Sequence, residues 1–187
     1  MGEERWFYRD ECDWVALVER LKLTPCPHCN TVGTLNRHGD LHGYDDTSPR
    51  RKTVRGRRLF CSNRGRRPGC GRTVSVWITD RIRRLSVTTR TLGTFLRRAV
   101  ADGIAAAIRA APNPRSDRTW QRLWRRFDRA QSRIRTALLA RGPPPEFPPG
   151  SVRRPDAAQL LAHLHATFPD ADSPLAAFQQ ATRSFVL

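Results

Sequence analysis

The chain lacks the long apolar run of a membrane-spanning helix and the apolar core of a secretory signal. Its longest apolar stretch, around Ile104–Ile108, is far shorter than the ~20 residues that cross a bilayer. The first residues, Met1–Asp10, are polar, and no apolar segment follows them. We therefore expect a cytoplasmic protein with no membrane partner, in a compartment where thiols stay reduced.

The carboxylate set of an acidic-triad nuclease and a nucleophile with a plausible base are also missing. The aspartates are scattered, and Asp45-Asp46 is their only adjacent pair, so no carboxylate set for two catalytic metals is evident. No glycine-rich phosphate loop is present. Cys26 and His28 could form a thiol–imidazole pair, but a metal knuckle accounts for both residues better. We expect no catalytic residues and no enzymatic activity from this chain.

Positive charge is what the chain has in excess. It contains 34 Lys+Arg against 17 Asp+Glu, a net charge of +17, and only Lys22 and Lys52 are lysines. Residues 26–85 carry 14 basic and 4 acidic side chains, and residues 86–141 carry 13 and 3, so each segment has a net charge of +10. A GC-rich genome also favours arginine over lysine, so the clustering matters more than the residue type. Such clustering is typical of a surface that faces a polyanion.

Four cysteines lie inside the first basic segment, as C-P-H-C and then C-x8-C. Two close pairs separated by a longer span are typical of a zinc site made of two knuckles, in which thiolates bind the ion tetrahedrally. A disulfide is the alternative. His28, His38 and His42 could substitute as ligands, but four cysteines already saturate zinc, so we expect them to be structural or exposed. The predicted cofactor is one structural Zn²⁺, bound by Cys26, Cys29, Cys61 and Cys70.

The rest of this segment has the pattern of a small antiparallel sheet. Arg58–Phe60 should form the strand that enters the second knuckle, and the run RTVSVWIT after it is rich in strand formers. Residues 33–53 are polar and should form a long hairpin or a loop. The SNRGRRPG insertion should form a basic loop. Before the knuckles, residues 10–23 have the apolar spacing of a short amphipathic helix, and the fifth cysteine, Cys12, is expected to be buried.

The second basic segment has helical periodicity. Ser86 should cap a helix that ends near Asp102, Gly103 permits a sharp turn into a short second helix, and Ser116 should cap a long third one. The third helix has an apolar stripe of Trp120, Leu123, Trp124, Phe127, Ile134 and Leu138. Three helices of which the last is long and basic match the plan of a helix-turn-helix, whose final helix enters the major groove. The alternative is a solvated helix whose arginines have no partner.

A proline-rich linker follows, and then a nearly neutral tail. Pro155–Thr167 should form a helix on which His163 and His165 lie on opposite faces, and Ser173 should cap a last helix containing Leu175, Phe178 and Phe185. This tail could pack back on the protein or form a dimer contact.

The run CPHC…RLFCSNRGRRPGCGRTVSVW resembles the N-terminal zinc ribbons of insertion-sequence transposase proteins. In those, a CPxC knuckle precedes a second knuckle, an R-[TF]-[FV]-S strand and a helix-turn-helix. The resemblance covers residues ~24–140 and implies binding to mobile-element DNA, with a transposase or recombinase partner or a homodimer. The long second knuckle and the lack of a catalytic domain depart from the pattern. The matching residues are Cys26, Cys29, Cys61, Cys70, Arg72, Thr73 and Ser75.

The fold class we expect is small α+β. Its predicted parts are an N-terminal amphipathic helix (1–23), a zinc ribbon (24–79), a helix-turn-helix-like region (80–141), a proline-rich linker (142–155) and a C-terminal helical tail (156–187).

The function we expect is zinc-dependent binding of double-stranded DNA, by a nucleoid-associated accessory or regulatory subunit of a bacterial mobile element. RNA binding is the first alternative, although the sequence shows no exposed aromatic pattern of a single-strand binder. Docking of a partner enzyme is the second. The predicted nucleic-acid contacts are Arg57, Arg58, Arg64, Arg66, Arg67, Arg72, Arg118, Thr119, Gln121, Arg122, Arg125, Arg126 and Arg129.

Overall fold

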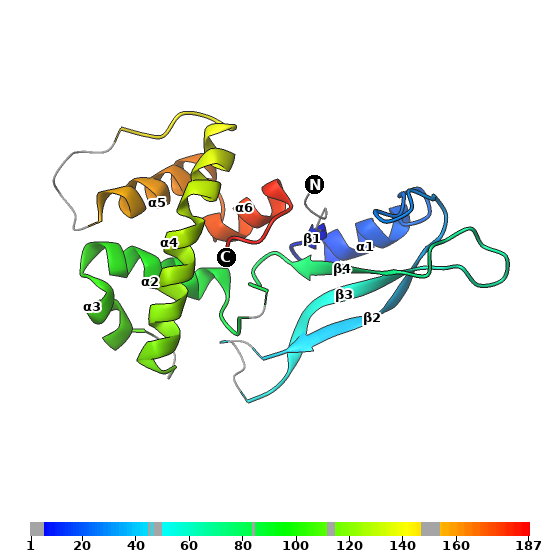
Figure 1. Cartoon of the computed structure of the whole chain (residues 1–187), viewed down its shortest axis with the longest axis horizontal. Helices are drawn as coiled ribbons and strands as arrows, with labels where there is room; N and C mark the ends of the chain where they lie inside the picture. Colours follow the sequence, from blue (N-terminus) through cyan, green and yellow to red (C-terminus); the bar gives the residue numbers. More distant parts are fainter. Residues whose placement is uncertain (1–5, 45, 47–49, 84, 112–114, 147–153) are drawn as a thin grey trace.

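The computed structural model describes residues 6–44, 46, 50–83, 85–111, 115–146 and 154–187. These form a four-stranded mixed sheet and six helices. The sheet and the first helix make up the sheet lobe, and the other five helices make up the helical lobe beside it (Figure 1). The small α+β class is therefore confirmed. The elements are β1 (Trp6–Tyr8), α1 (Glu11–Arg20), β2 (Leu35–Gly43), β3 (Thr53–Cys61), β4 (Thr73–Ile78), α2 (Thr89–Ala101), α3 (Ile104–Arg109), α4 (Asp117–Leu139), α5 (Pro155–Thr167) and α6 (Pro174–Thr182).

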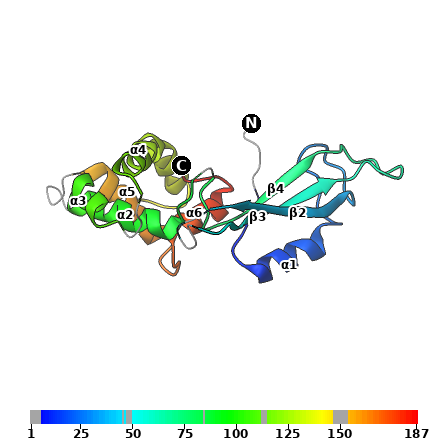
Figure 2. The same ribbon diagram turned by 90° about the horizontal axis from the view of Figure 1, so that it is seen from below.

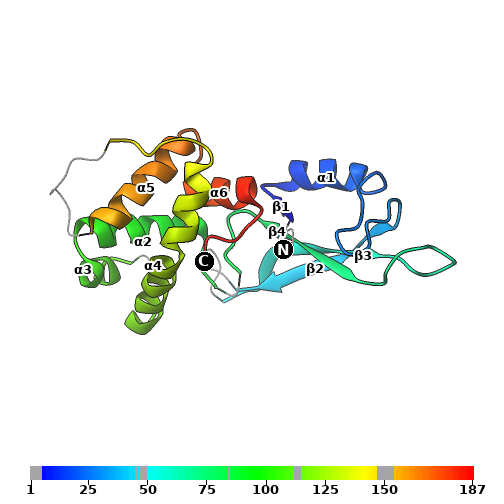
Figure 3. The same cartoon turned by 45° about the horizontal axis from the view of Figure 1, so that its top comes forward.

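The sheet has the order β1-β4-β3-β2, in which β1 runs parallel to β4 and the other pairs are antiparallel. Strand β1 was not predicted. For residues 33–53 the hairpin alternative is correct, because β2 pairs with β3 along most of its length. Helix α1 lies along one face of the sheet (Figure 2, Figure 3). Its N-cap, Asp10, accepts a hydrogen bond from the Asp13 amide, and its Trp14 is buried in the same apolar cluster as Leu59 and Val76.

The helical lobe contains the apolar stripe that the sequence predicted for the third helix, α4. All six residues of the α4 stripe are buried, and they lie in one core with the buried Leu92, Phe95, Leu96 and Ala99 of α2. The Phe95 and Trp120 ring centroids lie 4.7 Å apart, so the tryptophan belongs to the core. Gly103 has φ 92°, a conformation that side chains disfavour, and it forms the turn between α2 and α3 as predicted.

Of the predicted helix caps, the one at Ser86 is wrong and the one at Ser116 is confirmed in position only. Helix α2 is capped by Thr88, whose hydroxyl accepts from the Thr91 amide, and not by Ser86. Ser86 instead accepts a hydrogen bond from Arg115 (2.6 Å). Ser116 occupies the N-cap position of α4, but its hydroxyl pairs with that of Thr119 (3.0 Å) and caps no backbone amide.

The tail packs back against the helical lobe. Helix α5 has the predicted bounds, and its two histidines differ as expected, because His163 is buried and His165 is exposed. Ser173 caps α6 through the Ala176 amide. Phe185 lies beyond the end of α6, not within it as predicted. The proline-rich linker lies partly outside the described residues, and the dimer alternative stays a prediction.

The last residues of the chain join the two lobes. The Phe185 ring packs edge-on against Phe7 of β1 (5.1 Å between centroids) and Trp77 of β4 (5.4 Å). Arg133 of α4 donates hydrogen bonds to the Ser184 hydroxyl (2.7 Å) and to the Phe185 carbonyl (2.8 Å). The same short segment is thus bound to a helix on one side and to the sheet on the other.

Buried polar groups strengthen this junction. Gln179 of α6 donates to the carbonyl of Thr79, just after β4 (2.6 Å), and accepts from the Val186 amide (3.1 Å). From the sheet side, Arg55 of β3 donates to the Ile82 carbonyl (2.9 Å). A buried polar group that loses its partner is costly, so these bonds hold the lobes in one orientation.

Two further observations complete the fold. Cys12 is exposed on α1, so the expectation that it is buried was wrong. Within the described parts of the chain, no helix is both long enough and apolar enough to cross a bilayer.

The junction yields the first prediction. Phe185→Ala should destabilise the protein by about 3 kcal/mol, because a buried aromatic side chain leaves a cavity between the lobes. Chemical denaturation measures the change. Leu139→Ala is the control, since that side chain is 52% exposed and its truncation should change stability by about 0.5 kcal/mol or less. Equal stability of the two variants would show that Phe185 does not hold the lobes together.

Candidate metal centre and basic surface

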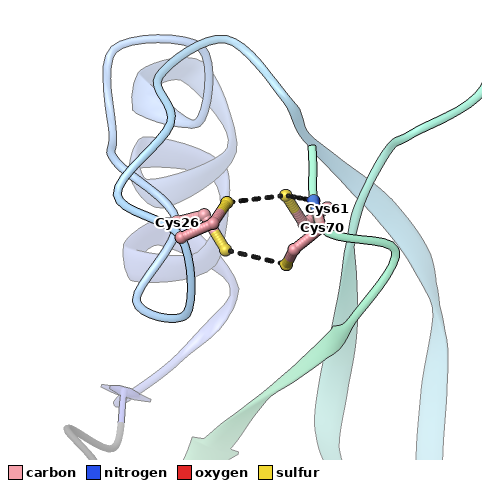
Figure 4. Close-up of side chains that lie close together, drawn as sticks. Cys26, Cys61 and Cys70 are labelled. Carbon is pink, nitrogen blue, oxygen red and sulfur yellow. Dashed lines mark hydrogen bonds between the residues drawn. The ribbon is translucent and has the colours of Figure 1, made fainter. Parts of the chain in front are cut away.

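The four predicted cysteines come together from three segments of the sheet lobe. Cys26 and Cys29 lie in the loop between α1 and β2, Cys61 is the last residue of β3, and Cys70 lies in the loop before β4. Cys26 and Cys61 are almost completely buried, at 1% and 0% exposure. Figure 4 shows Cys26 facing Cys61 and Cys70 across the gap between the loop and the sheet.

The sulfur positions fit a tetrahedral ion. The Sγ atoms of Cys26 and Cys70 are 3.8 Å apart, and those of Cys29 and Cys61 are 3.7 Å apart. All four sulfurs lie within 4.8 Å of one another. A tetrahedron with Zn–S bonds of about 2.3 Å has edges of about 3.8 Å, whereas a disulfide needs about 2.05 Å. The cluster can therefore hold a metal ion, and the disulfide alternative finds no support in this geometry.

Hydrogen bonds from the backbone stabilise negative charge on the sulfurs. The His28 amide donates to Cys26 Sγ (3.4 Å), and the Cys70 amide donates to Cys61 Sγ (3.3 Å). The buried Thr34 hydroxyl lies 3.1 Å from Cys61 Sγ. Sequence reasoning did not single out Thr34, since nothing in its spacing from the cysteines marks it. Such partners orient ligands and tune their affinity for the ion.

The second knuckle depends on a glycine that sequence reasoning also missed. A Cβ atom on Gly69 would lie 2.2 Å from the Ser62 carbonyl oxygen and 2.9 Å from Cys61 Sγ. No side chain fits in that space, so the eight-residue insertion can close over Cys61 only with glycine at this position. Its place directly before Cys70 is the one sequence signal that could have identified it.

The environments of the two cysteines in the first knuckle differ. Burial raises the pKa of Cys26 to about 12. Hydrogen bonds from Thr31 lower the pKa of Cys29 to about 6. At neutral pH Cys29 is therefore a thiolate in the metal-free protein, while Cys26 must lose its proton before it can bind an ion. The three histidines near the cluster in sequence, His28, His38 and His42, are all exposed, as expected.

The predicted basic loop lies at the tip of the second knuckle, at the end of the sheet lobe farthest from the helical lobe (Figure 1). Arg64, Arg66 and Arg67 are exposed, and so are Arg58 on β3 and Arg72 just before β4. Among the residues that the structure describes, none of these five forms an ion pair.

Arg57 behaves differently from the other predicted contacts. Its side chain is only 16% exposed, and its guanidinium binds Glu11 (2.5 Å) and lies 3.8 Å from Asp40. The same group stacks on the Trp14 ring at 5.0 Å. Arg57 holds α1 against the sheet, so its assignment as a nucleic-acid contact is corrected.

Four of the predicted nucleic-acid contacts on α4 lie on one side of the helix. At about 100° per residue, Arg118, Arg122, Arg125 and Arg129 fall within a sector of about 60°, opposite the buried stripe and about 17 Å long. All four are exposed, and none forms an ion pair within the described chain. We call these four residues the arginine stripe. Gln121 is exposed on one side of the stripe, whereas Thr119 and Arg126, on its other side, are half-buried.

Comparisons with known proteins add nothing to this geometry, since no protein-family model, curated protein or solved structure matches the chain.

The cluster predicts the effect of removing one ligand. Cys61→Ser should abolish stoichiometric metal binding and lower the melting temperature, because the knuckles lose the ion that closes them. Metal content by mass spectrometry and thermal unfolding test this. Cys12→Ser is the matched control, since Cys12 is exposed and outside the cluster. Full metal content in Cys61→Ser would contradict the ligand assignment.

The pKa difference predicts how metal affinity depends on pH. Since the pKa of Cys26 is raised to about 12, binding must release its proton, and the apparent affinity should rise about tenfold per pH unit between about pH 6.5 and pH 8 for each proton released. The pKa of Cys29 is lowered to about 6, so below about pH 6 this residue must also release a proton and the affinity should depend more steeply on pH. Competition with a chelator of known protonation at each pH measures the slope. A flat profile would contradict the assignment of Cys26 as a ligand.

Proposed function

We propose that this protein binds double-stranded DNA and that one zinc ion, bound by the four cysteines, holds the sheet lobe in its binding shape. The observation that carries the proposal is the arginine stripe. Four cations without acidic partners, on one side of a long helix and opposite its buried side, serve no packing purpose in the described structure.

The dimensions of α4 suit the DNA major groove. The groove is about 12 Å wide and admits an α-helix. The outer surface of α4 is not covered by another helix (Figure 2). Arg118, Arg122 and Gln121 lie in its first turns, where the recognition helix of a helix-turn-helix contacts base edges. Arginine can bind guanine through two hydrogen bonds, and glutamine can bind adenine in the same way.

The knuckle loop supplies a second cationic region. Arg64, Arg66 and Arg67 extend the reach of the protein beyond the helical lobe and would contact phosphates, which sets position rather than sequence preference. The ion would contribute only structure, because four thiolates complete a closed tetrahedral site with no open position for a substrate. No enzymatic step is assigned to this chain.

The biological role that we propose is an accessory or regulatory subunit of a mobile element, associated with the nucleoid. It is supported by the motif resemblance at Cys26, Cys29 and the Arg72–Ser75 strand. A transposase or recombinase partner is part of this proposal.

Two charge-matched double variants test the interface. Arg122→Ala with Arg125→Ala should weaken binding to duplex DNA and reduce the slope of log affinity against log salt by about 2, because two phosphate contacts are lost. Arg97→Ala with Arg98→Ala removes the same charge from exposed positions on α2 and should leave the slope unchanged. Fluorescence anisotropy over a salt series measures both, and circular dichroism checks the fold.

The wild-type protein provides the reference for this experiment. If about six phosphates are neutralised, its affinity should fall about 10³-fold between about 50 mM and about 200 mM salt. An affinity that hardly changes with salt would contradict DNA binding through these arginines. Equal slopes for the two double variants would move the interface away from α4. Preference for structured RNA in direct competition would favour the RNA alternative, and no binding to either would favour a protein partner.

A further inference from the structure

The sheet presents two faces of different character. Helix α1 covers the face that carries Arg57, Leu59 and Cys61 of β3, whose side chains alternate with those of Arg58 and Phe60 on the opposite face. At the helical end of this opposite face, Phe185 covers Trp77. Toward the knuckles no described helix or strand covers this face, and we call this part the open sheet face.

An aromatic pair lies on the open sheet face. The rings of His38 and Phe60 have centroids 5.5 Å apart and planes inclined by 34°. A register shift between Arg37 and Gly39 inserts His38 as an extra residue in β2, and its ring contacts that of Phe60. His38 is exposed and Phe60 is half-buried, so part of this aromatic surface is accessible to a ligand.

Two arginines lie on the same face as the His38–Phe60 pair. The Arg64 guanidinium lies 5.8 Å from the Phe60 ring centroid, and the Arg58 side chain is exposed on the same face. Neither arginine forms an ion pair with another described residue. The nearest acid of β2, Asp40, pairs with Arg57 toward α1. The open sheet face therefore combines accessible rings with positive charge that no described acid offsets.

We propose that the open sheet face binds an unpaired nucleotide, whose base stacks on the His38–Phe60 pair and whose phosphates contact Arg58 and Arg64. Aromatic rings that hold bases and arginines that follow the backbone are the two requirements of a single-strand site. An acidic peptide would satisfy the arginines but would leave the rings without a matching partner. The sequence did not reveal this pair, because a register shift in β2 brings the two rings together and spacing alone does not show it.

The position of the face agrees with this assignment. Helix α1 lies on one side of the sheet, while α4 lies at the opposite side of the molecule (Figure 2). In this view the side of the sheet away from α1 and the side of α4 away from the other helices face the same way (Figure 2). A duplex on α4 could continue toward the sheet as a single strand. The inference rests on the proposed nucleic-acid function, and the following experiment separates the two.

Three DNA probes distinguish stacking from charge. The first is a blunt duplex, the second is the same duplex with a single-stranded oligothymidine overhang, and the third has an abasic overhang with the same number of phosphates. The zinc-loaded full chain should bind the oligothymidine overhang about tenfold more tightly than the abasic one, since a stacked base contributes on this scale. Anisotropy titrations at one salt concentration measure the ratio.

Variants locate the stacking site. Phe60→Leu keeps an apolar side chain at this half-buried position but removes the ring, and it should reduce the ratio to about one, while Phe60→Trp should keep it. Tyr44→Ala is the matched control, because Tyr44 is an exposed aromatic residue outside the open sheet face. It should leave the ratio unchanged. Thermal unfolding and metal content verify that each variant is folded.

The outcomes are separable. Tight binding of the blunt duplex with equal affinity for both overhangs would overturn this inference and leave the proposed function standing. A ratio that Phe60→Leu does not change would also overturn it, since the base would then stack elsewhere. Binding of oligothymidine that depends on Phe60, without binding of blunt duplex, would support the single-strand site and contradict the duplex function. Displacement of oligothymidine by polyglutamate at equal concentration would overturn the inference in favour of a protein ligand.

Discussion

The shape of the sheet lobe depends on the convergence of four sulfur atoms. The loop after α1, the end of β3 and the insertion before β4 have few apolar side chains of their own, yet they meet with Sγ–Sγ distances of 3.7 and 3.8 Å. Four thiolates can stay at such distances only around a cation, and the cluster can hold one. An ion bound there would join the three segments and fix the base of the basic loop.

A second constraint acts at the other end of the sheet. Phe185 and Gln179 attach the C-terminal segment to β1 and β4, while Arg133 attaches it to α4. Because both lobes share this segment, the arginine stripe and the sheet cannot rotate freely against each other. The relative orientation of the arginine stripe and the sheet is thus set by Phe185, Gln179 and Arg133, none of which belongs to the stripe or to the knuckle loop.

Local signals in the sequence predicted the local features well. The spacing of the cysteines identified the cluster, because two cysteine pairs are the usual ligand set of a zinc site. The apolar periodicity of α4 identified its buried side, because that pattern depends on residues about one helical turn apart. Strand β1 was not predicted, since a three-residue strand that pairs in parallel with β4 depends on partners some seventy residues away. The cap at Thr88 was missed for a similar reason. The hydroxyl of Ser86 is bound by Arg115, which comes from a distant segment.

The arginines show why composition alone could not define the interface. Arg57 and Arg58 are adjacent, but strand geometry turns one toward Glu11 and Trp14 and the other toward solvent. Arg55, Arg115 and Arg133 likewise donate to backbone carbonyl groups and act as struts within the fold. The exposed arginines of the stripe, of the knuckle loop and of the open sheet face form no ion pair within the described chain. The arginines behind the net charge of +17 therefore include some that hold the fold together and others that lie exposed without an acidic partner. The register of the strands and the rotation of α4 decide to which group an arginine belongs, and the sequence alone does not show either.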